Sequence, residues 1–550
     1  MPNKHKILIF FISFTFYTNL YSQKREMLVY HNIKVDKNGY ILPWYSNNLG
    51  NSYNYVINKV WDFWYHMRSD YNGLPYYMNH QVWNSKLNDP RGVGGDQFAM
   101  ALSSWRMYYQ YSGNENVKEN MLFIADYYLS HGFSSSKASW PNLPFPYNTM
   151  TYSGIYDGDM RNGLNVTQPD KAGSFGYELL NLYKMSKGYN INENSNYLEN
   201  AIKIANTLSE KIQTGDKNHS PLPFKVNVLN GKIQLLRFHD FTNTWIDSAC
   251  YTTNLSSTMS LFIDLIKLKK GDTASYKLGF SKLLDWMKEC PLKTNQWGPF
   301  FEDVDWWSDT QINAMTFARF IMEHKEYFPN WKNDVLRIIL WFHQNFSNTS
   351  WSKYGVIVTN EQTVYQMPAN SHSARQASDE LFYVSETGDS LFYENAIREL
   401  NWATYMVNEN GANKFPSDEH WLTDGYGDYV RHFLRAMSTN YKLVPSNENH
   451  IIYTNSVIQQ ADYEGNLKKF YNVNFSNIDT SKVILFYRTY DSSGIEKIKL
   501  KNKPNKILIE GKEENITQSE NETHWTNTNN KEGVLTIIRK NGRNVVITHK

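Results

Sequence analysis

The chain has 550 residues, a formal net charge of +2 and 15% aromatic side chains, among them 39 Tyr and 17 Trp. The near-neutral charge leaves no electrostatic footprint for nucleic acid, and the length favours more than one domain. Cys250 and Cys290, the only cysteines, are too few for a disulfide framework and lack metal-ligand spacing. We therefore expect no metal, no cofactor and no nucleic-acid partner.

Residues 1–22 have the pattern of a secretory signal peptide. Lys4 and Lys6 precede an apolar run at residues 7–17, and the small residue Ser22 stands before the expected cleavage site. No later run is long enough to span a bilayer. We expect an exported protein, periplasmic or secreted, without a membrane span.

Residues 52–440 show helical periodicity that is interrupted by a recurring turn. Gly113, Gly188, Gly271 and Gly388 each end a periodic stretch, and Pro329 serves the same purpose. The turns recur about every 60–80 residues, as stacked helical hairpins do. The pattern predicts twelve helices, at residues 52–68, 96–112, 115–130, 172–187, 195–213, 250–269, 273–289, 309–325, 331–346, 372–387, 390–408 and 426–440.

Six such hairpins resemble the (α/α)6 toroid of many glycoside hydrolases and polysaccharide lyases, and closure into a ring is what this resemblance implies. The connections between hairpins are long and rich in aromatic, proline and charged residues. In an up-down ring they all emerge at one rim, and long loops of this kind are usually functional. The predicted rim segments are residues 69–95, 132–171, 214–249, 290–308, 347–370 and 409–425.

From about residue 447 the apolar pattern changes to period two, which predicts a small antiparallel β domain. Asn541-Gly542, between two apolar runs, predicts a hairpin turn. The expected strands lie at residues 482–488, 496–500, 506–510 and 533–538. The chain thus divides into a signal peptide (1–22), a mainly α catalytic toroid (23–446) and a β-sandwich-like domain (447–550).

The stretch from Tyr365 to Arg375 places an amide, an imidazole and a guanidinium at the start of a helix. Asn370, His372 and Arg375 there suit a carboxylate-bearing ligand, because helix N-termini favour anions. The alternative is a capped helix with three polar surface residues.

Further candidate side chains lie along the predicted rim. Arg161 and Lys171 supply cations for an acidic oligosaccharide or polysaccharide, and an acidic, aromatic segment follows at residues 297–307. The other candidates for substrate binding are His239, Trp306, Trp307 and Trp421, and the candidate carboxylates are Asp303, Asp305 and Asp424. No one of these pieces is a specific signature, and their accumulation on one rim predicts the cleft.

Two reactions and a non-enzymatic role remain open. β-Elimination on a uronic acid needs a neutralised carboxylate and a base, and toroid lyases use Asn, His, Arg and Tyr. Asn370 and Arg375 would hold the carboxylate while His372 or Tyr426 moves protons. Alternatively, Asp303 or Asp305 with Asp424 would hydrolyse a glycosidic bond. A glycan-binding protein would need only the aromatic and cationic side chains.

The mature chain also resembles exported Bacteroidota proteins of polysaccharide-utilisation systems. The similarity rests on three stretches, at residues 168–176, 400–406 and 421–432. It implies action on uronate-containing algal polysaccharide such as ulvan, by a lyase or by a dehydratase that removes water from a terminal uronic acid. Both reactions begin with the same proton abstraction.

Overall fold

The computed structural model describes residues 29–67, 73–78, 95–150, 153–159, 161–186, 191–239, 244–299, 307–414, 423–465, 479–528 and 531–549. The predicted signal peptide lies outside these residues. None of the described helices is both long enough and apolar enough to cross a membrane.

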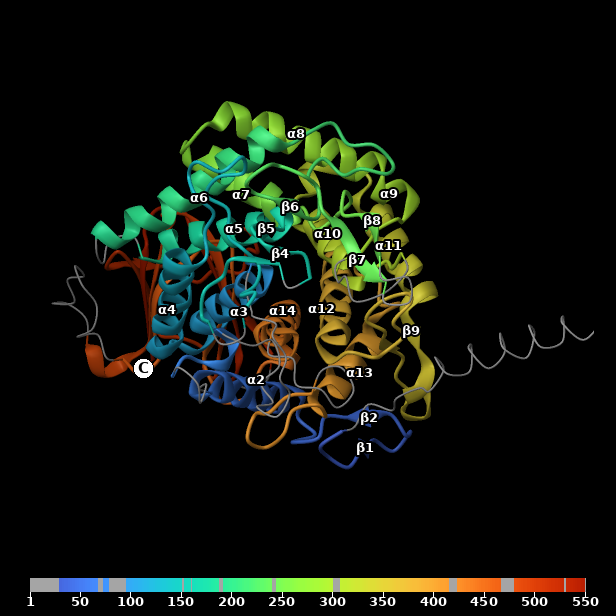
Figure 1. Cartoon of the computed structure of the whole chain (residues 1–550). Helices are drawn as coiled ribbons and strands as arrows, with labels where there is room; N and C mark the ends of the chain where they lie inside the picture. Colours follow the sequence, from blue (N-terminus) through green and yellow to red (C-terminus); the bar gives the residue numbers. More distant parts are fainter. Residues whose placement is uncertain are drawn as a thin grey trace, which may run out of the picture.

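In the described part of the chain, six helices form an inner ring in which each packs against the next and the last packs against the first. They are α3 (Gly95–Ser112), α5 (Pro169–Ser186), α7 (Ser256–Leu268), α10 (Gln311–Glu323), α12 (Asn370–Thr387) and α14 (Tyr429–Thr439). Figure 1 shows them around the centre of the molecule. The fold is therefore a closed (α/α)6 toroid, as the resemblance of the six hairpins to such toroids implied.

An outer helix packs against each inner one, and its apolar face covers the ring. The outer helices are α2 (Leu49–His66), α4 (Glu115–His131), α6 (Ile191–Lys211), α8 (Thr273–Glu289), α11 (Trp331–Phe346) and α13 (Tyr393–Thr404), with the short α9 (Pro291–Thr294) after α8. The large aromatic side chains mostly fill this interface. Trp64, Trp105, Trp297 and Trp402, for example, are fully buried.

The hairpin turns have the geometry that their sequences predict. Gly113, Gly271 and Gly388 have positive φ, which favours glycine. Asn114 and Asp272 then cap the following helices by accepting hydrogen bonds from Asn116 and Ser275. The predicted turn at Gly188 lies outside the described residues.

The long connections lie at the end of the ring opposite the hairpin turns, and neighbouring connections form hydrogen bonds with one another. The second and third connections meet through β5 (Val166–Thr167) and β6 (Val226–Asn227). Thr253 donates to the Trp297 carbonyl, and Thr310 forms a bridge with Gln362. The described connections therefore share one rim, as predicted.

Two features of the third connection differ from prediction. Residues 250–255 lie outside the helix that the sequence predicted, and the hydroxyls of Thr252 and Thr253 bond to neighbouring segments. A hairpin of β7 (Leu235–His239) and β8 (Thr244–Ser248) forms where the sequence predicted only a loop. Short two-stranded pairings elsewhere in the rim involve β1 (Lys34–Val35), β2 (Ile41–Leu42), β3 (Gly158–Asp159), β4 (Gly163–Leu164), β9 (Ser347–Asn348) and β10 (Val358–Thr359).

The C-terminal strands form two antiparallel sheets, which makes the fold mainly α with a small β domain, as expected. One sheet has the order β11 (His450–Thr454), β14 (Gly494–Leu500), β18 (Gly533–Arg539), β17 (His524–Asn527). The other has the order β12 (Ile458–Asp462), β13 (Val483–Thr489), β19 (Asn544–Thr548), β15 (Lys506–Ile509), β16 (Lys512–Glu514). The domain boundary near residue 447 stays a prediction.

The prediction of a hairpin at Asn541-Gly542 was wrong, because β18 and β19 belong to different sheets. The buried side chain of Arg539, the last residue of β18, holds the segment that passes from β18 to β19. Its guanidinium donates to the carbonyls of Gly542 and Asp491 and pairs with the buried carboxylate of Glu496 at 2.7 Å. The two apolar runs thus contribute to two sheets and not to one ribbon.

The β domain covers the end of the ring opposite the long connections, behind α3 and α4 in Figure 1. Tyr463 donates to the Gln110 carbonyl, and Gln459 donates to the Lys184 carbonyl. The ring of His450 stacks on Tyr111 at 3.8 Å. These contacts satisfy carbonyl groups at the C-terminal ends of α3 and α5, which have no partners within their own helices.

Replacing Gly173 by Ala should destabilise the toroid, because a Cβ at this position of α5 would lie 1.9 Å from Thr258 Oγ1 on α7. We expect a loss of about 1–3 kcal/mol in the free energy of unfolding, measured by urea denaturation. The double variant G173A/T258A removes the atom that the new methyl meets first and should recover part of the loss. Equal stability of G173A and the parent would contradict this packing.

Candidate active site at the head of the inner helices

One stripe of side chains on each inner helix faces the centre of the ring. On α12, Arg375 and Asp379 line the central cavity, and His372 lies one turn above them in the same stripe. On α5, Ser174 and Glu178 line the cavity, and Lys171 occupies the equivalent place. These positions lie near the N-terminal ends of the inner helices, at the end of the ring that carries the long connections. We call this end of the ring the mouth and the channel between the inner helices the bore.

Lys171 and His372 stand on opposite walls of this mouth. Each is the third residue of its helix, and α5 and α12 are separated by two helices in either direction around the ring. Both side chains are buried, at 2% and 0% exposure. The sequence pattern identified both residues but could not place them across from each other.

The imidazole of His372 is neutral at neutral pH. Burial, and then the positive charge of Arg375, hold its pKa well below the usual range. A neutral imidazole can accept a proton, so His372 is the candidate base of the mouth.

Asp428, at the end of the π-helical turn η4 (Thr423–Asp428), binds three basic groups. It pairs with Arg375 from α12 and with Arg431, and His432 Nε2 lies 3.2 Å from its Oδ1. Burial alone would raise the pKa of Asp428, but these groups together hold it well below its usual range. Asp428 therefore stays ionised and fixes α12 against α14.

Arg375 is thus held on two sides. Besides pairing with Asp428, it donates to Gln311 Oε1 at 2.8 Å, and Gln311 Nε2 bonds back to the His372 carbonyl at 3.3 Å. Its charge is already compensated, which leaves it less suited to a substrate carboxylate than the sequence indicated.

Asn370 and Tyr426 hold the sixth rim segment in place. The Asn370 amide donates to Asn413 Oδ1 at 2.6 Å and to the Lys414 carbonyl at 2.9 Å. The Tyr426 hydroxyl accepts a hydrogen bond from the backbone N–H of Asn413 at 2.7 Å. Burial raises the pKa of this phenol well above its usual value, so Tyr426 stays protonated. Its hydrogen bond to Asn413 ties Tyr426 to the sixth rim segment, and its role in proton transfer stays a prediction.

The remaining candidate residues are dispersed or outside the described residues. Arg161 is half-buried in the second rim segment, and Trp307 is 47% exposed with its ring 5.3 Å from that of Tyr251. The side chains of His239 and Asp424 are outside the description, although their backbones belong to β7 and η4. Trp306, Trp421, Asp303 and Asp305 lie outside the described residues altogether, so the acidic segment stays a prediction.

A buried ion pair joins the second and third rim segments. Lys225 Nζ lies 3.2 Å from Asp159, and both side chains have 0% exposure. Burial alone would raise the pKa of Asp159, but Lys225, backbone amides and Gln168 lower it. This pair stiffens the wall beside Lys171.

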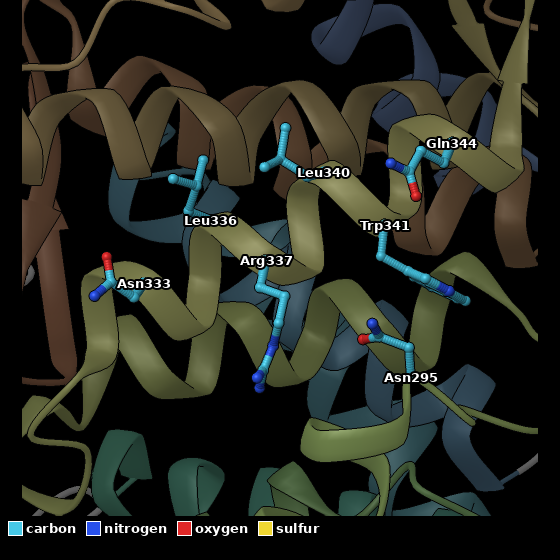
Figure 2. A pocket seen from close by; sticks show the side chains of 7 residues that line it. All are labelled: Asn295, Asn333, Leu336, Arg337, Leu340, Trp341 and Gln344. Atoms are coloured by element: carbon cyan, nitrogen blue, oxygen red, sulfur yellow. The ribbon is translucent and has the colours of Figure 1, made fainter.

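Below the mouth, Met100 of α3 and Ile312 of α10 pack against each other, although their helices stand opposite in the ring. A cavity of about 1100 Å³ extends from this contact to the β domain. A pocket of about 300 Å³ lies elsewhere, on the outer face of α11 (Figure 2). That pocket holds none of the candidate residues.

Among the described residues, no group of three His, Cys, Asp or Glu side chains is arranged to hold a metal ion. Cys250 and Cys290 are both free.

Comparison with solved structures shows the fold. A sugar epimerase from a ruminal bacterium is similar at a TM-score of 0.50 and 12% identity, over 70% of this chain and 96% of its own. Cellobiose 2-epimerases from Spirochaeta thermophila and Bacillus thermoamylovorans are similar at the same score and identity, over 71% and 70% of this chain and 97% and 99% of their own. No protein-family model and no curated protein matches the sequence.

Asp428, the acid that holds the cationic residues, was missed by reasoning from the sequence. Arg431, His432 and Arg435 follow Asp428 by three, four and seven residues, which places all four on one helix face. This spacing could have been recognised in the sequence. The pairing of Asp428 with Arg375 could not, because the two residues are far apart in the chain.

Acidification from about pH 7 to about pH 5 should lower the free energy of unfolding. Burial holds the pKa values of His372 and His432 below the value near 6.5 of an unfolded histidine. Below about pH 6.5 the unfolded chain thus binds more protons than the folded chain. The free energy of unfolding therefore decreases as the pH decreases, by up to about 1.4 kcal/mol per pH unit for each of the two histidines.

Urea unfolding of the parent and of H432Q across this range tests the effect, and H432Q should show a shallower loss. His343 is the matched control, because its bond to Glu380 raises its pKa against the effect of burial. Its contribution is full at low pH and is lost as the pH rises through the folded pKa, so H343Q should steepen the loss. Identical slopes in all three proteins would contradict the assignment.

Proposed function

We propose that the chain is a carbohydrate-active enzyme that performs β-elimination on uronic-acid-containing oligosaccharides. The observation that carries this proposal is the neutral imidazole of His372 at the start of α12, on the opposite side of the ring from Lys171 at the start of α5. β-Elimination needs a cation that stabilises the charge developing on the carboxylate and a neutral base that takes the C5 proton. Lys171 on α5 would supply the cation, and His372 on α12 would supply the base.

In this proposal, Lys171 binds the carboxylate and His372 removes the proton. Arg161, on the second rim segment, is the further cation available to an acidic substrate. Arg375 and Asn370 position His372 and the sixth segment, since their donors are engaged with Asp428, Gln311 and Asn413. Tyr426, a protonated phenol, supports the same segment.

Carbohydrate processing also agrees with the fold, since the neighbours named above are a sugar epimerase and cellobiose 2-epimerases. The leaving group at C4 decides between a lyase, which releases a sugar, and a dehydratase, which releases water. Ulvan is the polysaccharide that the sequence resemblance favours. Export, as residues 1–22 predict, would bring the enzyme to such a substrate.

Epimerisation is the second candidate, favoured by these same neighbours. Inversion beside a carbonyl also starts with removal of a carbon-bound proton, so the same base would serve. Hydrolysis by Asp303 or Asp305 with Asp424 is a third reaction that the products distinguish.

The test is incubation with uronate-containing oligosaccharides, ulvan fragments among them, while the ultraviolet absorbance of a C4–C5 double bond is followed. NMR of the products in D2O separates the three reactions. Elimination gives an unsaturated sugar, epimerisation gives a saturated epimer carrying deuterium, and hydrolysis gives saturated products without deuterium at carbon. Saturated products alone would overturn the elimination.

Two variants test the roles of the residues. H372Q should lower kcat about 10²–10⁴-fold, as expected for loss of a general base. K171M should impair acidic substrates far more than their methyl esters, because it removes only the partner of the carboxylate.

H343Q, which changes a histidine outside the bore, should keep its activity. Full turnover by H372Q, together with loss of turnover in D303N or D305N, would show that the carboxylates do the chemistry. Equal losses of K171M on acidic and esterified substrates would show that Lys171 is structural.

A further inference from the structure

The central cavity extends from Met100 and Ile312 to the β domain. We call it the lower chamber. It is lined by the middle and C-terminal parts of the inner helices and closed on one side by residues 452–457 and parts of 491–497 of the β domain. Its volume of about 1100 Å³ is in the range of sites for small organic ligands.

Several of the charges that line the chamber form ion pairs. Arg106 pairs with Glu178, and Lys184 pairs with Asp264. Arg319 pairs with both Glu323 and Asp379. Arg375 and Arg431 share Asp428.

Arg435 also lines the lower chamber and, like Lys267 and Lys497, forms no ion pair within the described part of the chain. Burial first, and then the positive charges of Arg319 and Arg431, lower the pKa of Arg435 to about 9. The nearby carboxylates of Asp379 and Glu323 act in the opposite direction, and the guanidinium is charged at neutral pH.

A second observation lies one helical turn away. Arg431 Nε is buried and has no hydrogen-bond partner among the described residues, although the other end of this guanidinium binds Asp428. Ser438 and Thr439 also line the chamber, and their hydroxyls donate to the carbonyls of Arg435 and Ala436. The unmet donor of Arg431 and the guanidinium of Arg435 therefore lie one turn apart on α14.

We propose that the lower chamber binds a small oxyanion, such as phosphate, sulfate or the carboxylate of a single uronic acid, with Arg435 as its principal partner and Arg431 Nε as a further donor. Guanidinium groups bind such anions through charge-assisted, often bidentate hydrogen bonds. Lys267 and Lys497 are further cations of the lining, whereas Lys325 pairs with Glu386.

The test measures binding to the full chain by calorimetry and by the shift in Tm. The probes are sodium phosphate, sodium sulfate and sodium glucuronate, with sodium chloride at equal ionic strength and glucose as the neutral control. An oxyanion should raise Tm, since ligand bound to the native state stabilises it. R435M should weaken binding about tenfold or more, the usual effect of losing a hydrogen bond to a charged group.

R435M should fold, because it replaces an unpaired buried charge by an apolar side chain of similar length. R337M makes the same exchange on the outer face of α11 (Figure 2) and should bind as the parent does. H372Q should also bind normally, so binding here is distinguishable from the reaction at the mouth.

Preference for glucuronate would identify a uronate site, and preference for phosphate or sulfate would identify an inorganic-anion site. Absence of oxyanion-specific stabilisation, or equal binding by R435M and the parent, would overturn the proposal.

Discussion

The structure depends on the pairing of charges inside a helical ring. Buried charges are costly unless a partner of opposite sign lies close, and removing one partner of such a pair is strongly destabilising. Here acids and bases pair between α3 and α5, α5 and α7, α10 and α12, and α12 and α14. These pairs fix the rotation of each inner helix and thereby decide which side chains face the bore.

Asp428 shows how this constraint reaches the site. It holds Arg375, Arg431 and His432, and Arg375 in turn bonds to Gln311, whose amide reaches the backbone of His372. Burial and the positive charge of Arg375 keep the imidazole neutral. Lys171, the candidate cation, comes from the opposite helix of the ring, so neither group depends on the other for its place.

Much of the fold could be predicted from the sequence, because its signals are local. The glycine turns at Gly113, Gly271 and Gly388, the caps that follow them and the period of the apolar residues define the helices within a few residues. The crossing at Asn541-Gly542 could not be predicted, because Glu496 and Arg539 decide it from different strands. Similarly, Asn370, His372 and Arg375 were recognisable as a polar group, but their partners come from other helices. The contacts in the folded structure distinguish the candidate base, His372, from Asn370 and Arg375, whose side chains are bonded to other segments.

The closed ring has a consequence for how the chain reaches its native state during synthesis. The interface that closes it joins α3 to α14, which end and begin at residues 112 and 429, and residues 30, 31 and 44 bond to residues 404–407. No shorter nascent chain can complete these contacts, so the first hairpins leave the ribosome with an apolar edge still uncovered. Such non-local closure slows folding and prolongs exposure to aggregation. Until its last helices have been made, this uncovered edge is therefore where the nascent chain is most exposed to aggregation.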